Sequence, residues 1–332
     1  MAKQAMASSS LLGAASSSGI SRQPLVSVNI GTFNLGLHQT QIESRDFSKK
    51  VLPNFRRVVA RGVDEGHLSL LNLCEVGGHR LGLEAYNIDP ALIVQETLPE
   101  GEYGCSASQA YMSIWNETGA SHPGGVSLKP WKSEVIELRS APSLEPQLVV
   151  TQYTVTTNAA AYQAQLVVGQ LHIRTPSNRN SPKTITRQKV VREALDLISQ
   201  TANMCLVQPT VAMLCGDVNL TTENADSCCQ HLRDSGTVLS DLRLHWHTEK
   251  SCGQLGGDVA FVRGCSSVSF DVAIGASYAD RGIRNDHHDF FGVTLYVPFF
   301  ALPTMKGDLP QKSASSWQIQ GHARWLPLAT PG

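Results

Sequence analysis

The sequence of 332 residues lacks long apolar segments. No apolar run approaches the length of about 18 residues that a transmembrane helix needs. We therefore expect no transmembrane segment. Hydrophobic residues still make up 42% of the chain and charged residues 17%, which is typical of a globular protein with a large core. One large domain or two small ones are expected.

An excess of charge of either sign is also missing. The chain has 27 basic and 28 acidic residues, and its formal net charge is -1. This balance provides no long-range attraction towards nucleic acid, although a local basic groove can exist on a neutral protein. Net charge therefore neither identifies nor excludes a polyanionic substrate. Aromatic residues are few, at 6%, and Trp246 is the candidate for stacking on a base.

The eight cysteines form no Cys-x-x-Cys pair and have no histidines at the spacing of a zinc site. The adjacent Cys228 and Cys229 cannot easily bridge to each other. Cys74 and Cys215 fall in apolar runs, where a thiol behaves as a small hydrophobic group. The pattern argues against structural zinc and predicts free thiols in a reducing, intracellular compartment.

The two ends of the chain differ in composition from the middle. Residues 1–24 are rich in Ala and Ser and contain no acid. They fit either a disordered tail, which we favour, or an organelle transit peptide. Beyond residue 298 the chain becomes poor in apolar residues. We therefore expect a tail at 1–24, one domain at 25–298 and a C-terminal appendage at 299–332.

Polar groups close the strands that are predicted in the first part of the domain. A β-rich run at 25–35 delivers Asn34 to its end, and an apolar strand at 68–74 is closed by Glu75. Between them, residues 47–65 show the spacing of an amphipathic helix that covers a sheet. A carboxylate that ends a buried run is unfavourable unless it is paired or bound to a metal, which singles out Glu75. The alternatives are a loop acid for Glu75 and a turn-forming amide for Asn34.

The middle of the chain predicts mostly strands. Residues 84–107 give a weak pattern, with a turn or short helix at 89–97 and a loop at 99–108. Strands are expected at about 110–115, 133–138, 148–157 and 162–173. Short connections rich in Gly and Pro favour antiparallel neighbours. The last of these strands ends with His172.

A strand-helix-strand unit follows, with a helix at 184–200 and a buried strand at 210–215. This strand leads directly into Gly216-Asp217-Val218-Asn219. Alternation puts Asp217 and Asn219 on the same side of the chain at the exit of the strand. The alternative is an Asx-turn with no chemical role.

Two more acids stand beside predicted strands in the last part of the domain. Asp258 begins a strand, and Asp286 with His287 precedes the apolar run at 290–296. The strand ends together deliver a set of polar groups of one chemical kind: Asn34, Glu75, His172, Asp217 with Asn219, Asp258, and Asp286 with His287. Several acids beside amides make a hard oxygen site, which suits magnesium, calcium or manganese better than zinc or copper.

Over about residues 25–297 the sequence resembles the endonuclease/exonuclease/phosphatase superfamily, which includes deoxyribonuclease I, abasic-site endonucleases, neutral sphingomyelinases and inositol-polyphosphate 5-phosphatases. Gly216-Asp217-Val218-Asn219 matches the family's Gly-Asp-Phe-Asn pattern, and Asn285-Asp286-His287 matches its Ser-Asp-His pattern. The resemblance implies an α/β fold, a four-layered α-β-β-α sandwich. Its two facing sheets would be mixed and largely antiparallel, with the site at one end.

The resemblance also implies roles for the residues. Glu75 would bind Mg²⁺, or Mn²⁺ or Ca²⁺, with Asn34 and Asp286 in or near its shell. Asp217 and Asn219 would position the attacking water and the scissile phosphate.

The remaining site residues are a pair of histidines with their partners and one cation. His287, oriented by Asp258, would be the acid/base or phosphate-stabilising group. His172 matches a second histidine that an upstream acid holds, for which Glu96 is the candidate. Arg174 is a further candidate for binding phosphate.

The sequence departs from the family at two places. Cys74 stands where the family usually has Gln, and Gln170 stands where Asn is common. These positions adjoin the reacting groups, so they affect rate and substrate choice more than reaction class. The prediction is a monomeric, divalent-metal-dependent phosphoester hydrolase of nuclease- or phosphodiesterase-like type, with DNA and RNA among its candidate substrates. The alternatives are a catalytically silent binding module and a phosphatase of inositol phosphates or lipid head groups.

Overall fold

A computed structural model describes residues 25–37, 42–77, 82–120, 125–144, 146–157, 162–173, 184–205, 210–234, 243–247, 257–271, 290–298 and 300–301. The chain divides into two compact units, Met1–Leu302 and Pro303–Gly332, and the described residues all belong to the first. The predicted tail and most of the predicted appendage lie outside the described residues, so the domain boundaries at 24 and 298 stay predictions.

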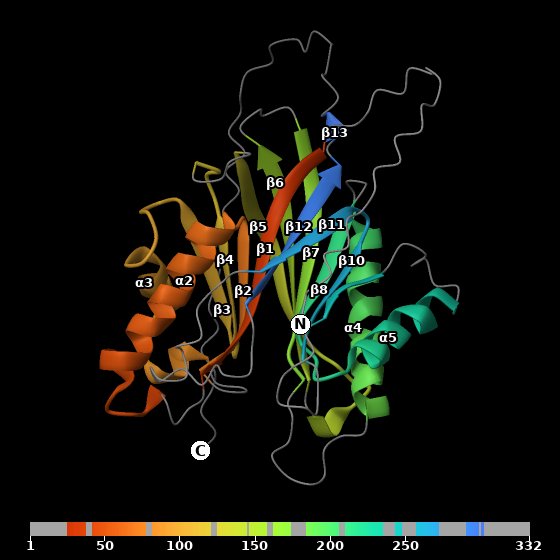
Figure 1. Ribbon diagram of the computed structural model, residues 1–332, viewed down its shortest axis with the longest axis horizontal. Helices are drawn as coiled ribbons and strands as arrows, with labels where there is room; N and C mark the ends of the chain where they lie inside the picture. Colours follow the sequence, from red (N-terminus) through yellow and green to blue (C-terminus); the bar gives the residue numbers. More distant parts are fainter. Residues whose placement is uncertain are drawn as a thin grey trace, which may run out of the picture. The chain divides into compact units, whose positions relative to one another are not determined.

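The first sheet is built from six strands: β1 (Leu25–Leu37), β2 (Leu70–Val76), β3 (Tyr103–Ser108), β4 (Tyr111–Asn116), β11 (Ser266–Asp271) and β12 (Phe291–Pro298). Their order in the sheet is β11-β12-β1-β2-β4-β3 (Figure 1). β1 and β2 are parallel, and the other neighbours are antiparallel. Because a parallel pair needs a crossover, α2 (Leu52–Gly66) connects β1 to β2 across the outer face of the sheet.

The second sheet has seven strands: β5 (Val126–Glu137), β6 (Gln147–Thr157), β7 (Tyr162–Leu171), β8 (Thr210–Asp217), β9 (Arg243–His247), β10 (Asp258–Arg263) and β13 (Phe300–Ala301). Six of them follow the order β5-β6-β7-β8-β10-β9, and β13 pairs with β7. β7 and β8 are the parallel pair here, and α4 (Thr184–Met204) is their crossover helix.

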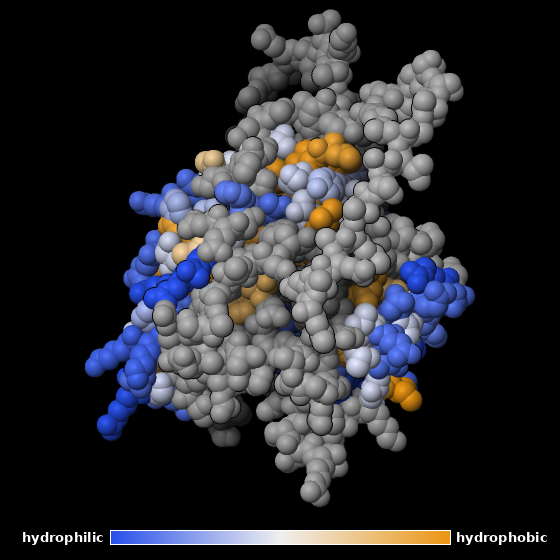
Figure 2. Space-filling view, in the orientation of Figure 1, coloured by the Kyte–Doolittle hydropathy of each residue, from blue (hydrophilic) through white to orange (hydrophobic). Residues whose placement is uncertain are grey.

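Helical segments cover the outer face of each sheet (Figure 1). Beside α2 and α4, they are η1 (Phe47–Val51), η2 (Leu83–Tyr86), α3 (Pro90–Gln95), η3 (Pro142–Leu144) and α5 (Thr222–Asp234). Figure 2 shows hydrophilic residues gathered over α2 on one side and over α5 on the other. In the part of the chain that the structure describes, no helix is both long and apolar enough to cross a membrane.

Of the four apolar clusters among the described residues, the three large ones follow from this layering, and the fourth consists of Cys74, Tyr111 and Val149. Phe55 of α2 and Leu73 of β2 belong to the core under the first helical layer. Ile30 of β1 and Leu166 of β7 belong to the core between the sheets. The third core packs α4 and α5 on the second sheet. The predicted four-layered α-β-β-α sandwich with two facing mixed sheets is therefore confirmed.

Most of the predicted elements are present with shifted ends. The predicted helix at 47–65 is a π-helical turn, η1, followed by α2, and the helix at 184–200 continues to Met204. The weak pattern at 84–107 gave no firm prediction; of the loop expected at 99–108, only 99–102 is loop, and β3 occupies the rest at the edge of the first sheet. In β3, Tyr103, Cys105 and Ala107 alternate with Gly and Ser and pack against the core under α2, and the strand pairs with β4. Strands β9 and β11 and helix α5 were not predicted.

Candidate active site

Side-chain alternation sends most of the predicted groups into the space between the sheets. In β1, Val28 and Ile30 belong to the core between the sheets, whereas Phe33 and Leu35 belong to the core under α2. Asn34 therefore shares the inter-sheet face with Ile30. The same alternation of side chains along β7, β8 and β10 places three more groups on this face: His172, Asp217 and Asp258.

Asn34 makes a direct contact across the two sheets. Its Nδ2 donates to Asp217 Oδ2 over 3.1 Å, although the two residues are 183 positions apart. Its Oδ1 accepts the Gly36 N–H at 2.9 Å, where β1 is irregular and Gly36 has φ +61°. The amide is only 1% exposed, so these two bonds hold it in one orientation.

Glu75 is the exception to the alternation. Leu71 and Leu73 belong to the core under α2, so a regular strand would point Glu75 towards the helices. Its backbone is left-handed instead, with φ +55°. Its Oε1 lies 3.2 Å from His172 Nε2, with side-chain exposures of 15% and 5%. A left-handed residue that is not glycine is unfavourable by about 1–2 kcal/mol, and such strain concentrates at functional sites.

Asp217 has both carboxylate oxygens in use. Oδ2 accepts from Asn34, and Oδ1 accepts the Asn219 N–H at 3.1 Å, which is an Asx-turn. From the sequence, the Asx-turn and a role in the site were alternatives for Asp217. The structure shows that Asp217 forms the turn and also contacts Asn34. Asn219 is left-handed at φ +51°, and its Nδ2 donates to the Ile173 carbonyl at 2.9 Å.

Asp258 lies directly opposite Asp217 in the β8-β10 ladder, and each is 2% exposed. The preceding Gly257 allows this packing, because a Cβ atom there would lie 2.7 Å from Asp217 Oδ1. Two buried carboxylates on adjacent strands require a cation or several hydrogen-bond donors nearby. The site thus contains two buried carboxyl groups side by side.

Some of the predicted site residues cannot be placed. Arg174, Asp286 and His287 lie outside the described residues, so the metal role of Asp286 and the pairing of His287 with Asp258 stay predictions. Among the residues that are described, no group of three or more His, Cys, Asp or Glu is arranged to hold a metal ion.

The acid that was expected to hold His172 is corrected by the structure. Glu96 forms an ion pair with Arg56, and its side chain is 53% exposed. Glu75 contacts His172 instead. The physical reason is geometric: Glu96 follows α3 on the outer helical layer, whereas His172 faces the space between the sheets.

Sequence reasoning missed Tyr111, which holds the backbone of His172. The Tyr111 hydroxyl accepts the His172 N–H at 2.9 Å and donates to the Gln147 carbonyl at 2.9 Å. Burial raises the pKa of the Tyr111 phenol well above its ordinary value. Its position at the start of an apolar strand looks like ordinary core, so no local pattern could have identified it.

A polar layer lies between the apolar core and the site. Gln170 Nε2 donates to Asn72 Oδ1 at 2.6 Å, Ser113 Oγ donates to the same oxygen at 3.2 Å, and Asn72 Nδ2 donates to Cys215 Sγ at 3.6 Å. Gln170 therefore links the two sheets two residues before His172. Burial, and then the nearby carboxylates, raise the pKa of the Cys74 thiol well above its ordinary value, so it stays protonated. Gln170 and Cys74 are the two positions that depart from the family pattern; the first bonds across the sheets, and the second is a buried thiol.

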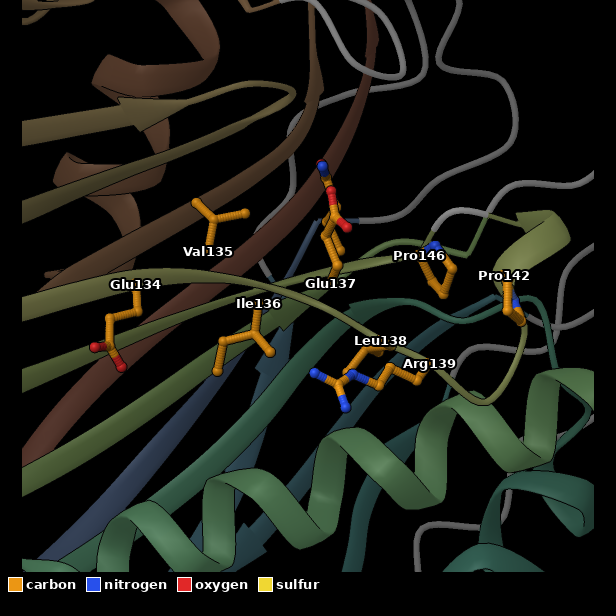
Figure 3. Close-up of a pocket in the computed structure, with 9 residues that line it drawn as sticks. Glu134, Val135, Ile136, Glu137, Leu138, Arg139, Pro142 and Pro146 are labelled. Carbon is orange, nitrogen blue, oxygen red and sulfur yellow. The ribbon is translucent and has the colours of Figure 1, made fainter. Parts of the chain in front are cut away.

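A groove of about 980 Å³ lies at the β5 edge of the second sheet, and none of the described candidate site residues lines it. Figure 3 shows Val135 and Glu137 on one side of β5, with Ile136 on the other. Its lining residues are Glu134, Val135, Ile136, Glu137, Leu138, Arg139, Pro142, Pro146 and Gln147. Its one link to the site described here is indirect: the Gln147 carbonyl accepts from the Tyr111 hydroxyl, which in turn accepts the His172 N–H.

Two facing mixed sheets between helical layers, with polar groups at one end, are the fold of the endonuclease/exonuclease/phosphatase superfamily. Among solved structures, TDP2 from C. elegans aligns with a TM-score of 0.53 and 12% identity, over 82% of this chain and 75% of its own. A truncated Caenorhabditis elegans TDP2 aligns with the same TM-score and identity, over 82% of this chain and 98% of its own. An endonuclease/exonuclease/phosphatase from Bacteroides vulgatus aligns with a TM-score of 0.49 and 13% identity, over 83% and 100%.

No protein-family model matches the sequence, and no curated protein matches it significantly. At the identities of the solved structures, the likeness establishes the fold alone. The activity has to be argued from the site.

Proposed function

We propose that this chain is a divalent-metal-dependent phosphoester hydrolase of nuclease- or phosphodiesterase-like type. The observation that carries the proposal is the pair of contacts between the sheets, Asn34 with Asp217 and Glu75 with His172. They gather an amide, carboxylates and an imidazole at one end of a rigid scaffold. The endonuclease/exonuclease/phosphatase fold supports the reaction class.

The donor set fits a hard divalent cation. Asn34 offers an amide oxygen, and the left-handed backbone of Glu75 aims a partly exposed carboxylate at the same end of the sandwich. With Asp286, these residues would hold Mg²⁺, Mn²⁺ or Ca²⁺. The bound cation would neutralise charge on the phosphate oxygens during attack.

The residues of the chain would divide the remaining chemistry. Asp217 would orient the attacking water, because hydrogen bonds from the Asn34 amide and the Asn219 N–H fix the position of its carboxylate. Asn219 and Arg174 would contact the phosphate. His287, held by Asp258, would give a proton to the leaving oxygen, and His172 would orient Glu75.

Substitution of Asp217 by Asn tests this proposal, because the side chain keeps its size and loses its charge. With bis(p-nitrophenyl) phosphate and Mn²⁺ or Mg²⁺, we expect kcat to fall by about 10²-fold or more. Asp226→Asn, the same change on the exposed face of α5, is the matched control and should leave kcat unchanged. An Asp217→Asn variant that is folded and fully active would contradict the proposed mechanism.

A metal titration of the wild-type protein distinguishes the proposed hydrolase from the alternative, a binding module. The proposed hydrolase should bind Mg²⁺ or Mn²⁺ at millimolar concentration or below, as measured by calorimetry. A protein that binds neither cation and hydrolyses no phosphodiester would be the silent member of the fold.

The compartment that we propose is reducing and intracellular. In support, all seven cysteines in the described ranges are free thiols. Burial raises the pKa of Cys215 and that of Cys229 to about 12, so these thiols stay protonated and resist oxidation.

A further inference from the structure

Arg187 is a buried cation close to the site, and none of the roles above uses it. It lies in the first turn of α4 and is 1% exposed, the bulkiest of the fully buried side chains. Burial lowers the pKa of its guanidinium, and the charge of Asp217 partly offsets this change. An arginine remains charged at neutral pH even so. A buried guanidinium is unfavourable unless specific acceptors hold it, so the burial of Arg187 indicates a specific role for its contacts.

The guanidinium reaches the segment that contains Asp217 and Asn219. Arg187 Nη1 donates to the Asn219 carbonyl at 3.3 Å. Asn219 has a left-handed backbone, and the other bonds that hold it come from Asp217 and Ile173 at the strand ends. Arg187 bonds the same residue from helix α4, so hydrogen bonds to both the strand ends and the helical layer fix the turn.

The next residue strengthens this connection. Gln188 Nε2 donates to the Asn224 carbonyl at 3.2 Å and to Ser227 Oγ at 2.7 Å. The first turn of α4 thus contacts both the turn at Asn219 and the start of α5. A segment with this number of tertiary contacts is held in one geometry, as positioned catalytic groups require.

We infer that Arg187 is a positioning residue: from the helical layer it holds Asp217 and Asn219 where they can orient water and phosphate. It does not contact the substrate itself. The inference rests on the proposed function, because it assigns Arg187 to the same site. Glu75 and Asn34 belong to the other sheet, so loss of Arg187 should leave metal affinity unchanged. Its effect should appear in kcat more than in KM.

The test compares Arg187→Met and Arg187→Lys with the matched control Arg263→Met. Arg263 holds the same helix at the opposite end of β8 and β10, where its Nη1 donates to the Ser199 carbonyl at 3.4 Å and to Asn203 Oδ1 at 3.1 Å. Both Met variants remove a hydrogen-bonded guanidinium from the α4 interface; Arg187 is buried and Arg263 is partly exposed. Only Arg187→Met removes a hydrogen bond to the turn that contains Asp217 and Asn219.

We expect Arg187→Met to lower kcat for bis(p-nitrophenyl) phosphate on the order of 10- to 100-fold, with KM and Mn²⁺ affinity close to wild type. Arg187→Lys, which keeps the charge and one donor, should recover part of the loss. Arg263→Met should keep wild-type kcat. Amide hydrogen exchange of the peptide that contains residues 217–220 should be faster in Arg187→Met and unchanged in Arg263→Met.

The outcomes separate the two proposals. Equal kcat in Arg187→Met and Arg263→Met, or unchanged exchange at 217–220, would overturn the positioning role. If Arg187→Met does not fold, Arg187→Lys provides the same comparison of kcat and exchange. If the wild-type protein hydrolyses no phosphodiester, the proposed function fails, and the exchange measurement alone decides whether Arg187 holds the turn.

Discussion

Gly216→Ala should destabilise the protein through a backbone contact next to the candidate site. Gly216 precedes Asp217 and has φ +129°, a conformation that residues with a Cβ atom rarely adopt. A Cβ atom there would lie 2.2 Å from the Leu171 carbonyl oxygen and 3.0 Å from its carbonyl carbon. Both atoms are backbone, so no side-chain rotation relieves the contact.

The magnitude follows from two contributions. The positive φ costs about 1–2 kcal/mol for a residue other than glycine. Overpacking against a rigid neighbour adds about 1–3 kcal/mol. The neighbour is rigid because β7 and β8 pair in parallel, and the Ile173 N–H bonds the Asp217 carbonyl at 2.8 Å just beyond. Gly216→Ala should therefore lower the free energy of unfolding by about 2–5 kcal/mol.

Gly101→Ala is the matched control. Gly101 also has a positive φ, +74°, but nothing lies within 4 Å of the Cβ atom that the substitution adds. It should cost about 1–2 kcal/mol, from the backbone conformation alone. Both substitutions change the entropy of the unfolded chain equally, so the difference between them measures the contact with Leu171 together with the less accessible φ of Gly216.

Urea unfolding monitored by circular dichroism measures both variants, and bis(p-nitrophenyl) phosphate hydrolysis reports on the displacement of Asp217. We expect Gly216→Ala to lose activity and Gly101→Ala to keep it. If Gly216→Ala unfolds at the same urea concentration as Gly101→Ala, the close approach of β8 to Leu171 is not a constraint, and the reasoning is refuted.

Two further predictions concern groups beside the site. Tyr111→Phe removes the hydroxyl that bonds the His172 N–H and the Gln147 carbonyl, and it should lower the free energy of unfolding by about 1–3 kcal/mol in urea; a change close to zero would show that water replaces both bonds. Burial raises the pKa of Glu193, but hydrogen bonds from Ser140 and Arg139 and the charge of Arg139 outweigh it, so the pKa lies below its ordinary value of 4.5. The stability that Glu193 contributes is then complete above pH 4.5 and is lost as the pH falls through the folded-state pKa. Glu193→Gln should be less stable than wild type at pH 6 by a margin that shrinks in acid, and a margin independent of pH in urea titrations would contradict this sign.

Several parts of the site could be predicted from the sequence because they depend on local chemistry. Asn34, Asp217 and Asp258 each stand at the end of a strand and on the face that alternation assigns to the space between the sheets. Buried polar groups at such points are rare without a partner, so their presence indicates a site before any contact is known. The role of Glu75 in the site stays a prediction, and the structure brings its carboxylate to His172 although regular alternation would point it to the other face.

The errors also have a common cause. Glu96 was assigned to His172 because it is an upstream acid, yet it lies on another layer and pairs with Arg56. β3 was assigned to a loop because its alternating residues are mostly small, and its pairing with β4 makes it a strand. In both cases the deciding contact joins two elements of the fold, and a local sequence pattern does not show how such elements pack together.

The sequence alone determined which segments are strands and helices in most of the domain, and which polar groups stand at the strand ends. Period and composition act over a few residues, so they can be read directly from the chain. Only the tertiary structure decided that Asn34 bonds Asp217, that Glu75 turns towards His172, and that Arg187 bonds the Asn219 carbonyl. These contacts depend on how two sheets and a helical layer pack, and packing joins residues as far apart as 183 positions.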